Sequence, residues 1–183
     1  KQATFSYPGG CDIGSRPIDL HLKGFEKLGI NVEEEYGKIK CNTEEIKGTE
    51  INLEFPSVGA TENIMLASVL GNGITTIINA AMEPEIVDLQ NFLNKMGAKI
   101  EGAGSNIVKI QGVKNLKDVS YNIMPDRIEA GTILCAVAIT GGKVELQKVN
   151  YEHITPGLDK LQEIGCKIGI NGDTVKLEAN KRL

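Results

Sequence analysis

The residues of this sequence best suited to chemistry lie close together in residues 8–17. This stretch holds three glycines and two prolines, which excludes a helix or a central strand and predicts a long loop. Cys11 lies on that loop, where a thiol contributes little to packing. Arg16 would favour the thiolate form of Cys11, while Asp12 would oppose it. The local pattern therefore favours a functional thiol over an incidental exposed one.

The other three cysteines have different surroundings. Cys135 lies in an apolar stretch of helical character, residues 133–137, which predicts a small buried side chain. Cys41 and Cys166 occupy ordinary hairpin or strand positions. No two cysteines have Cys-x-x-Cys spacing, and no histidine cluster accompanies them. We therefore expect reduced thiols in a cytoplasmic protein, and no zinc site.

The start of the helix that follows the loop is a candidate for binding an anion. Pro17 is predicted to start a helix that continues over residues 18–22, because proline suits the first helical position. Arg16, directly before it, could help to hold a negatively charged group at the helix N-terminus. Asp19 falls in the first turn, where an acidic side chain complements the helix dipole.

A second anion candidate is the stretch 56–61, which leads into a helix at Ala60. Ser57 or Thr61 could simply cap that helix. Alternatively, Ser57 and the backbone N–H groups beside it could face a phosphate. The residues alone leave both interpretations open.

The remaining polar clusters have ordinary structural explanations. Residues 83–85 and 126–129 place acidic side chains where helices are expected to begin. His21 and His153 have no partner pattern, and neither is assigned a catalytic role. The sequence has neither a G-x-G-x-x-G fingerprint nor a Walker sequence.

The composition is typical of a folded protein with an aliphatic core. Of the 183 residues, 41% are hydrophobic but only 4% are aromatic. The formal net charge of -4 lacks the basic surplus of nucleic-acid-binding proteins, so no nucleic-acid partner is expected. No apolar run reaches the ~18 residues of a membrane-spanning helix, and no signal peptide is recognised. Because Lys1 leads directly into a strand-like segment, we expect a piece of a longer protein.

An internal repeat organises the chain. Three segments carry apolar residues at helical spacing and end in a large apolar residue followed by glycine, at Gly29, Gly97 and Gly165. The same interval, 68 residues, separates each pair of neighbouring glycines. Dividing the chain length by this period gives about 2.7 units.

A second type of helix recurs with nearly the same period. It is predicted over residues 60–70 and 128–139, and glycines and a strand follow it at residues 74–79 and 143–148. Each unit is thus predicted to contain a helix, a strand hairpin, a strand, a helix and a strand. We expect the units to pack as one pseudo-symmetric body.

Several of these stretches resemble signature sequences of the enolpyruvyl transferase family, in the branch that acts on UDP-N-acetylglucosamine. The most specific match is residues 8–20, which include Cys11. Residues 57–63, 83–88 and 125–132 are similar to further family stretches and follow in the same order. The resemblance extends over essentially the whole chain.

The resemblance implies an α/β (α+β) fold of the inside-out type, in which repeats place helices inside and sheets outside. Six units of this period would need about 408 residues, so the chain would be a fragment. Residues 1–125 would form the later part of the cysteine-loop catalytic domain. Residues 126–183 would form one repeat unit of the second domain, and the remainder of the parent chain would be a partner.

The resemblance also implies a reaction. The family branch moves the enolpyruvyl group of phosphoenolpyruvate to the 3'-hydroxyl of UDP-N-acetylglucosamine and releases phosphate, the first committed step of peptidoglycan synthesis. It proceeds by addition and elimination, with no metal or organic cofactor. Cys11 matches the family's general acid, which can form an adduct with phosphoenolpyruvate and is alkylated by fosfomycin.

The same resemblance implies two groups of substrate-binding residues. Arg16 matches an arginine that contacts substrate phosphate, where a charge-assisted hydrogen bond is valuable. The segment beside the uridine is Pro17, Ile18, Asp19 and Leu20, and the segment beside the diphosphate is Ser57, Val58 and Gly59.

The sequence departs from the family pattern in ways that limit the expected activity. Phe55 stands where some members carry a lysine near the nucleotide, so one charge contact is lost. The family's phosphoenolpyruvate-binding lysine precedes the matched region, and its catalytic aspartate and a further arginine follow residue 183. We therefore expect this chain alone to be inactive.

Two alternative functions fit the same residues less well. The chain could be a non-catalytic remnant that binds nucleotide-sugar or only packs as repeats. It could also belong to the sibling transferase that acts on shikimate 3-phosphate, but that branch lacks the cysteine loop.

Overall fold

The chain folds as two compact parts, each with its own core. The computed structural model describes residues 1–8 and 17–180. Unit 1 comprises Lys1–Asn122, and unit 2 comprises Ile123–Leu183. No described residue belongs to both aliphatic cores. The expectation of one body is therefore wrong, because the last repeat buries its apolar residues among themselves.

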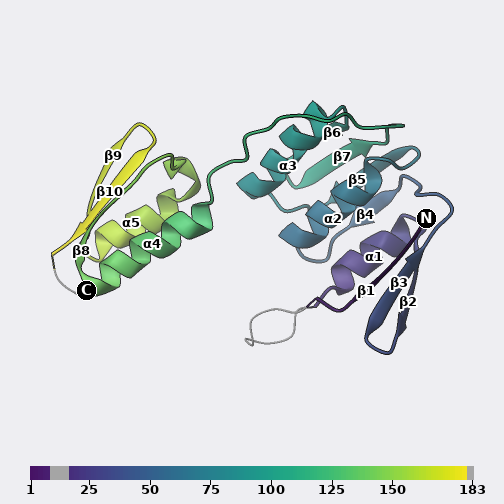
Figure 1. Cartoon of the computed structure of the whole chain (residues 1–183), viewed down its shortest axis with the longest axis horizontal. Coiled ribbons are helices and arrows are strands. Elements are labelled where there is room, and N and C mark those ends of the chain that lie inside the picture. Colours follow the sequence, from purple (N-terminus) through teal and green to yellow (C-terminus); the bar gives the residue numbers. More distant parts are fainter. Residues whose placement is uncertain (9–16, 181–183) are drawn as a thin grey trace. The chain divides into compact units, whose positions relative to one another are not determined.

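Among its described residues, unit 1 combines three helices with two sheets (Figure 1). One sheet has the strand order β1-β3-β2, and the other has the order β4-β5-β7-β6. Only β4 and β5 pair in parallel, and the other pairs of strands are antiparallel. The elements are β1 (Gln2–Ser6), α1 (Asp19–Lys27), β2 (Asn31–Glu35), β3 (Lys38–Asn42), β4 (Glu50–Asn52), α2 (Val58–Ser68), β5 (Ile74–Ile78), α3 (Pro84–Lys95), β6 (Lys99–Glu101) and β7 (Ile107–Gln111).

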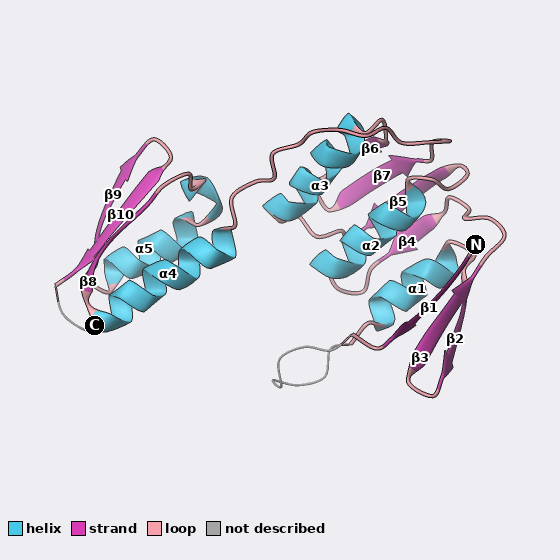
Figure 2. Cartoon of the chain, viewed as in Figure 1, coloured by secondary structure: helices cyan, strands magenta, loops and turns pink. Residues whose placement is uncertain are grey.

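Helices α2 and α3 pack against one face of the four-stranded sheet, and α1 packs beside α2 with contacts to β4 and to β2 of the other sheet (Figure 2). Along β7, exposed and buried residues alternate, as expected for a strand with one face on a core. Val108 and Ile110 of β7, Ile77 of β5 and Ile64 of α2 are fully buried. Helix α2 packs between α1 and α3, so its position is fixed from both sides.

Unit 2 repeats the same design on a smaller scale. Its elements are α4 (Arg127–Thr140), β8 (Gly142–Leu146), the short 3-10 helix η1 (Tyr151–His153), α5 (Thr155–Glu163), β9 (Lys167–Asn171) and β10 (Thr174–Ala179). The sheet has the order β8-β10-β9, with antiparallel pairs. Leu134 of α4, Leu158 of α5 and Leu177 of β10 join in its core.

One arrangement of strands occurs three times along the chain. A strand is followed by a helix and then by a hairpin, and the second hairpin strand lies in the middle of the sheet. The three sets are β1-β3-β2, β5-β7-β6 and β8-β10-β9. The predicted α/β class and its repeats are therefore confirmed.

The second repeat lacks one predicted strand. Residues 112–126 form no strand in the described chain. Instead, the N–H of Val113 donates to the carbonyl of Val69, and the N–H of Lys117 donates to the carbonyl of Met96, which are the ends of α2 and α3. Further along, the hydroxyl of Tyr121 donates to the carboxylate of Asp88 at 2.8 Å. The segment is therefore tied to helices and not to a sheet edge.

The three predicted helix ends share one geometry. Gly29, Gly97 and Gly165 have φ of 83°, 103° and 108°, the left-handed region that favours glycine. At each end, the N–H of the residue after the glycine donates across six residues to a carbonyl of the last turn, at 3.0 Å. This is the Schellman arrangement of a helix C-terminus. The period of 68 residues is thus the interval between successive helix C-termini of this type.

We expect Gly97→Ala to destabilise unit 1 by about 1–2 kcal/mol, because an alanine pays the steric cost of the left-handed conformation. No atom lies within 4 Å of the added Cβ, so the backbone is the only source of that cost. Urea unfolding measures the effect. Gly131→Ala in α4 is the control, since it also meets nothing within 4 Å and should stabilise unit 2 by about 0.5–1 kcal/mol. Equal effects of both changes would contradict the explanation.

The predicted burial of Cys135 is wrong. Helix α4 turns Ala130, Leu134 and Ala138 toward the core, at four-residue spacing. Cys135 follows Leu134 by one residue, which rotates it about 100° away from that face. Its side chain is exposed, while Cys166 is buried.

Candidate functional site

The predicted site residues form three groups. One group lies outside the described residues, and the other two lie within them. Cys11 and Arg16 lie outside the described residues. Pro17, Ile18, Asp19 and Leu20 lie at the start of α1, and Ser57, Val58 and Gly59 lie at the start of α2.

Helix α1 begins two residues later than predicted. Ile18 is the N-cap residue and has a non-helical backbone, with φ of -118° and ψ of 13°. No side-chain hydrogen bond caps this end within the described residues. Asp19 is the acidic residue of the first turn, as expected from the helix dipole. The first N–H groups of α1 therefore have no side-chain acceptor in the part of the chain that the structure describes.

The start of α2 has a side-chain cap and two further donors. The hydroxyl of Ser57 accepts a hydrogen bond from the N–H of Ala60 at 3.3 Å, so the capping interpretation is confirmed. The N–H groups of Val58 and Gly59 have no acceptor among residues 1–8 and 17–180. Two backbone donors therefore remain at the positive end of this helix dipole.

Burial fixes the first turn of α2 in place. Thr61 is fully buried, and its hydroxyl donates to the carbonyl of Ser57 at 2.8 Å. The same hydroxyl accepts a hydrogen bond from the N–H of Ala81 at 3.1 Å. Both hydrogen-bonding roles of a hydroxyl are thus used to hold the helix start against the chain after β5.

The structure brings the two predicted binding segments together through His21. Asn63 Nδ2 lies 2.9 Å from His21 Nδ1 and donates to the carbonyl of Gly59 at 3.0 Å. The ring of His21 also covers Gly59, because a Cβ built there would lie 3.1 Å from His21 Cε1. The sequence assigned His21 no role, since its partner lies 42 residues away and only the fold makes them neighbours.

The close approach of α1 and α2 also depends on a glycine. A Cβ at Gly24 would lie 2.6 Å from Cδ1 of Ile64, so any side chain there would force Ile64 to move from its present position. Gly24 is buried and Ile64 is fully buried. The two helix starts are therefore held side by side by core packing as well as by hydrogen bonds.

The carboxyl of Glu62 lies in the first half of α2. Its burial raises the pKa of Glu62, and the nearby charge of Glu85 raises it further. A raised folded pKa means that the folded state binds more protons than the unfolded state. Stability therefore falls as pH rises from the carboxyl's unfolded pKa through its raised folded pKa.

We expect Glu62→Gln to remove the loss of folding stability that ionisation of this carboxyl causes at high pH. At pH 8, the free energy of unfolding should rise by about 0.5 kcal/mol, a small effect because the side chain is only half buried. At pH 3, where the carboxyl is protonated in both states, the variant should match the wild type. Urea unfolding at both pH values tests this, and equal stabilisation at both would contradict the electrostatic explanation.

A recess adjoins the start of α1. It has a volume of about 300 Å³, and Leu20 of the predicted uridine segment is part of its wall. Lys23 and Glu54 form an ion pair at 2.8 Å across it. Phe55, which stands where some relatives have a lysine, is 65% exposed. Phe55 therefore presents an aromatic surface two residues before Ser57 of the predicted diphosphate segment.

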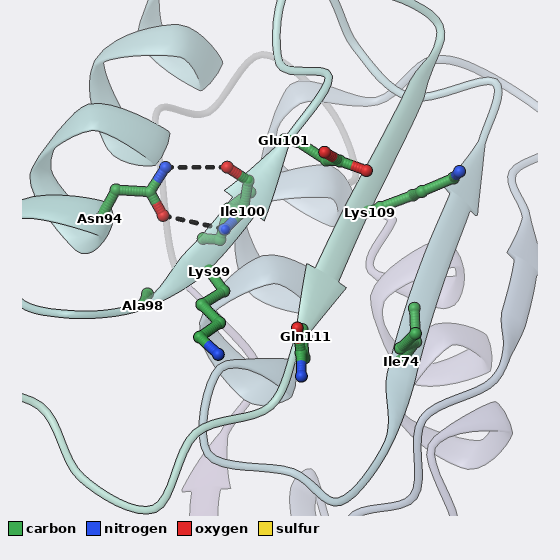
Figure 3. A pocket seen from close by; sticks show the side chains of 8 residues that line it. All are labelled: Ile74, Asn94, Ala98, Lys99, Ile100, Glu101, Lys109 and Gln111. Carbon is green, nitrogen blue, oxygen red and sulfur yellow. Dashed lines mark hydrogen bonds between the residues drawn. The ribbon is translucent and has the colours of Figure 1, made fainter.

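A larger recess on the four-stranded sheet of unit 1 contains none of the predicted site residues (Figure 3). It has a volume of about 390 Å³ and is lined by residues of β5, β6 and β7 and the end of α3. The amide of Asn94 is occupied, because it donates to the carbonyl of Ile100 and accepts from its N–H, both at 2.8 Å. This recess is therefore a weaker candidate than the two helix starts.

Two of the described thiols, Cys41 and Cys166, are poorly suited to nucleophilic chemistry. Burial raises the pKa of Cys41. Burial also raises the pKa of Cys166, with a further contribution from Cys135. Since the thiolate is the reactive form, neither Cys41 nor Cys166 is activated.

The described part of the chain shows neither a metal-binding cluster nor a membrane-spanning helix. Within residues 1–8 and 17–180, no group of three or more His, Cys, Asp or Glu side chains could hold a metal ion. In the same ranges, no helix has the length and apolar character needed to cross a bilayer.

Solved structures share this fold. The enolpyruvyl transferase NikO from Streptomyces tendae superposes with a TM-score of 0.80 and 21% identity, over 97% of this chain and 44% of NikO. EPSP synthase from Acinetobacter baumannii gives a TM-score of 0.65 and 19% identity, over 98% of this chain and 42% of that protein. The predicted enolpyruvyl-transferase type of fold is confirmed.

Curated relatives are much closer in sequence. "UDP-N-acetylglucosamine 1-carboxyvinyltransferase 2" from Caldanaerobacter subterraneus subsp. tengcongensis is 58% identical over 100% of this chain and 44% of its own length. "UDP-N-acetylglucosamine 1-carboxyvinyltransferase 1" from Symbiobacterium thermophilum is 54% identical over 97% of this chain and 41% of its own length. The chain thus spans less than half of these relatives, and the resemblance noted in the sequence is confirmed.

A sequence model of one family, described as EPSP synthase (3-phosphoshikimate 1-carboxyvinyltransferase), matches residues 1–182. Since this match extends over nearly all of the 183 residues, the chain belongs to the EPSP synthase (3-phosphoshikimate 1-carboxyvinyltransferase) family.

Proposed function

We propose that the chain is part of an enzyme that transfers the enolpyruvyl group of phosphoenolpyruvate to the 3'-hydroxyl of UDP-N-acetylglucosamine and releases phosphate. The observation that carries this proposal is the identity of 58% along the whole chain to a relative named for that reaction. The cysteine loop supports the same branch of the family, because the sibling that acts on shikimate 3-phosphate lacks it.

In the proposed reaction, Cys11 is the general acid. Its thiol gives a proton to the methylene carbon of phosphoenolpyruvate while the sugar hydroxyl adds to the neighbouring carbon. The methyl group then returns a proton to the thiolate as phosphate is expelled and the double bond is restored. The proton that the sugar hydroxyl gave up leaves with the phosphate, so no oxidant or reductant is needed. Arg16 supports the phosphate through charge-assisted hydrogen bonds.

The nucleotide-sugar would bind where α1 and α2 begin. The N–H groups of Val58 and Gly59, which have no acceptor among the described residues, suit the oxygens of a diphosphate. The hydroxyl of Ser57 lies beside them and caps the same helix. Residues 17–20 at the start of α1 would support the uridine, and the recess beside Leu20 offers it room.

The rest of the active site would come from the remainder of a longer protein. Residues 1–125 would be the later part of the cysteine-loop catalytic domain, and residues 126–183 one repeat unit of the second domain. The chain spans 44% of the Caldanaerobacter relative, which supports a missing remainder. The proposed enzyme works in the cytoplasm without a metal or an organic cofactor.

The test is phosphate release by the full-length gene product. With phosphoenolpyruvate present, UDP-N-acetylglucosamine should stimulate release, and shikimate 3-phosphate should not. Release with shikimate 3-phosphate alone would assign the sibling activity. If phosphate is released with neither UDP-N-acetylglucosamine nor shikimate 3-phosphate as acceptor, the result would support a non-catalytic remnant.

The 183-residue chain alone should release no phosphate above background under the same conditions. The proposed site is incomplete in it, because the lysine, aspartate and arginine implied by the family have no match there. The measurement is the same phosphate assay at equal molar concentration. Turnover by the chain alone would contradict the proposed division of the site.

A further inference from the structure

His21 lies between the two helix starts that the proposed function assigns to the nucleotide-sugar. It follows Leu20 in the first turns of α1, and its ring edge covers Gly59 of α2. Nδ1 lies 2.9 Å from Nδ2 of Asn63. The side chain is half buried, so both contacts are partly shielded from water.

The hydrogen bonds define which nitrogen of His21 carries the proton. The amide nitrogen of Asn63 donates to the carbonyl of Gly59 at 3.0 Å, which fixes the orientation of the amide. Its second hydrogen must then point to His21 Nδ1, so Nδ1 is the acceptor. The proton of the neutral ring is therefore on Nε2, on the side that faces Gly59.

A charged imidazolium would not fit this arrangement. Both ring nitrogens of His⁺ are donors, so protonation would set Nδ1 against the amide hydrogens of Asn63. Burial lowers the pKa of His21, although the charge of Asp19 partly opposes this. The ring is therefore neutral at pH 7, as the contact with Asn63 requires.

The contact with Gly59 is tight, and a side chain there would push the ring of His21 away by a few tenths of an ångström. A Cβ at that position would lie 3.1 Å from Cε1 and 3.5 Å from Nε2 of His21. The imidazole therefore fills the place of a side chain on α2 and determines how closely the first turn approaches α1. The two donors of that turn, Val58 N–H and Gly59 N–H, are held in the same way.

We propose that His21 is a positioning residue for the nucleotide-sugar: it links α1 to α2 through Asn63 and Gly59, and so holds the donors of Val58 and Gly59 in place for the diphosphate. The inference rests on the proposed function. It assigns His21 an effect on binding of UDP-N-acetylglucosamine, and none on the chemical step or on phosphoenolpyruvate.

His153 provides a matched control. It also pairs with an asparagine, because its Nε2 lies 3.0 Å from Nδ2 of Asn150. That partner lies only three residues away in unit 2, and neither residue belongs to the predicted substrate segments. Loss of His153 removes a similar hydrogen bond without changing the helix starts of unit 1.

The experiment is steady-state kinetics of the full-length gene product with both substrates varied. His21→Leu should raise KM for UDP-N-acetylglucosamine by about tenfold. A change of this size corresponds to the free energy of about one hydrogen bond. KM for phosphoenolpyruvate and kcat should stay within about threefold of wild type. His21→Gln, whose amide keeps an acceptor for Asn63, should recover most of the loss. His153→Leu should leave all three constants unchanged.

The outcomes separate this inference from the proposed function. Unchanged KM for UDP-N-acetylglucosamine in His21→Leu would overturn the role of His21. Equal rises in both KM values, with no recovery in His21→Gln, would also overturn it and indicate a purely structural role. A wild-type protein without phosphate release dependent on UDP-N-acetylglucosamine would overturn the proposed function and this inference together.

Discussion

Replacing Cys11 by serine in the full-length gene product is expected to lower kcat for enolpyruvyl transfer by about 100-fold or more. A positioned general acid contributes about 10²–10⁴-fold to a rate, and a serine hydroxyl is too weakly acidic to replace the thiol. Labelling by fosfomycin should be lost in the same variant, because the alkylated sulfur is gone. The measurements are phosphate release and the intact mass after fosfomycin treatment.

Cys135→Ser is the matched control for this prediction. Cys135 is an exposed thiol of unit 2, so it tests whether exposure alone makes a cysteine reactive. The variant should keep its activity and its labelling by fosfomycin. Peptide mapping that placed the label on Cys135, or full activity in Cys11→Ser, would contradict the role of the loop cysteine.

The second large effect is expected in the core between α1 and α2. Ile64→Ala should lower the free energy of unfolding of unit 1 by about 2–5 kcal/mol, the usual cost of such a truncation at a fully buried site. Ile64 is fully buried and packs against Gly24 of α1. Binding of UDP-N-acetylglucosamine should weaken as well, because the same contact holds the two helix starts together.

Leu66→Ala is the control on the same helix. Leu66 is 49% exposed, so its truncation should cost less than about 1 kcal/mol. Urea unfolding of the 183-residue chain compares the two variants. The quantity compared is the free energy of the unfolding transition of unit 1. Similar losses for both would show that α2 is not held by the core face that contains Ile64.

Local signals in the sequence predicted much of the fold. The glycines at positions 29, 97 and 165 are readable because helix termination is a short-range event that glycine performs best. The cap of α2 was predicted for the same reason, since Ser57 caps a turn only three residues away, although the helix begins at Val58 and not at Ala60 as predicted. Repetition of these signals at one interval then indicated the architecture.

Contacts between distant residues were not predictable in the same way. His21 and Asn63 are 42 residues apart, and neither has a local pattern that points to the other. The exposure of Cys135 depends on which side of α4 meets the sheet, and that helix is apolar on several sides. The separation into two cores also depends on long-range packing, which a repeat period does not specify.

The two interpretations of Ser57 illustrate how the site combines structure and function. The sequence left capping and phosphate binding open, and the structure shows the cap. A capped helix start can still bind an anion, because the cap uses the N–H of Ala60 and leaves those of Val58 and Gly59 without an acceptor in the described chain. Capping therefore fixes the turn that presents these two donors.

The most direct test of this account is hydrogen exchange of the full-length gene product with and without UDP-N-acetylglucosamine. Amides without an acceptor exchange quickly, so a ligand that binds them should slow their exchange clearly. The account predicts slower exchange in residues 17–22 and 57–61, and no change in residues 99–111 of the sheet recess. Protection of residues 99–111 without protection of the two helix starts would contradict it.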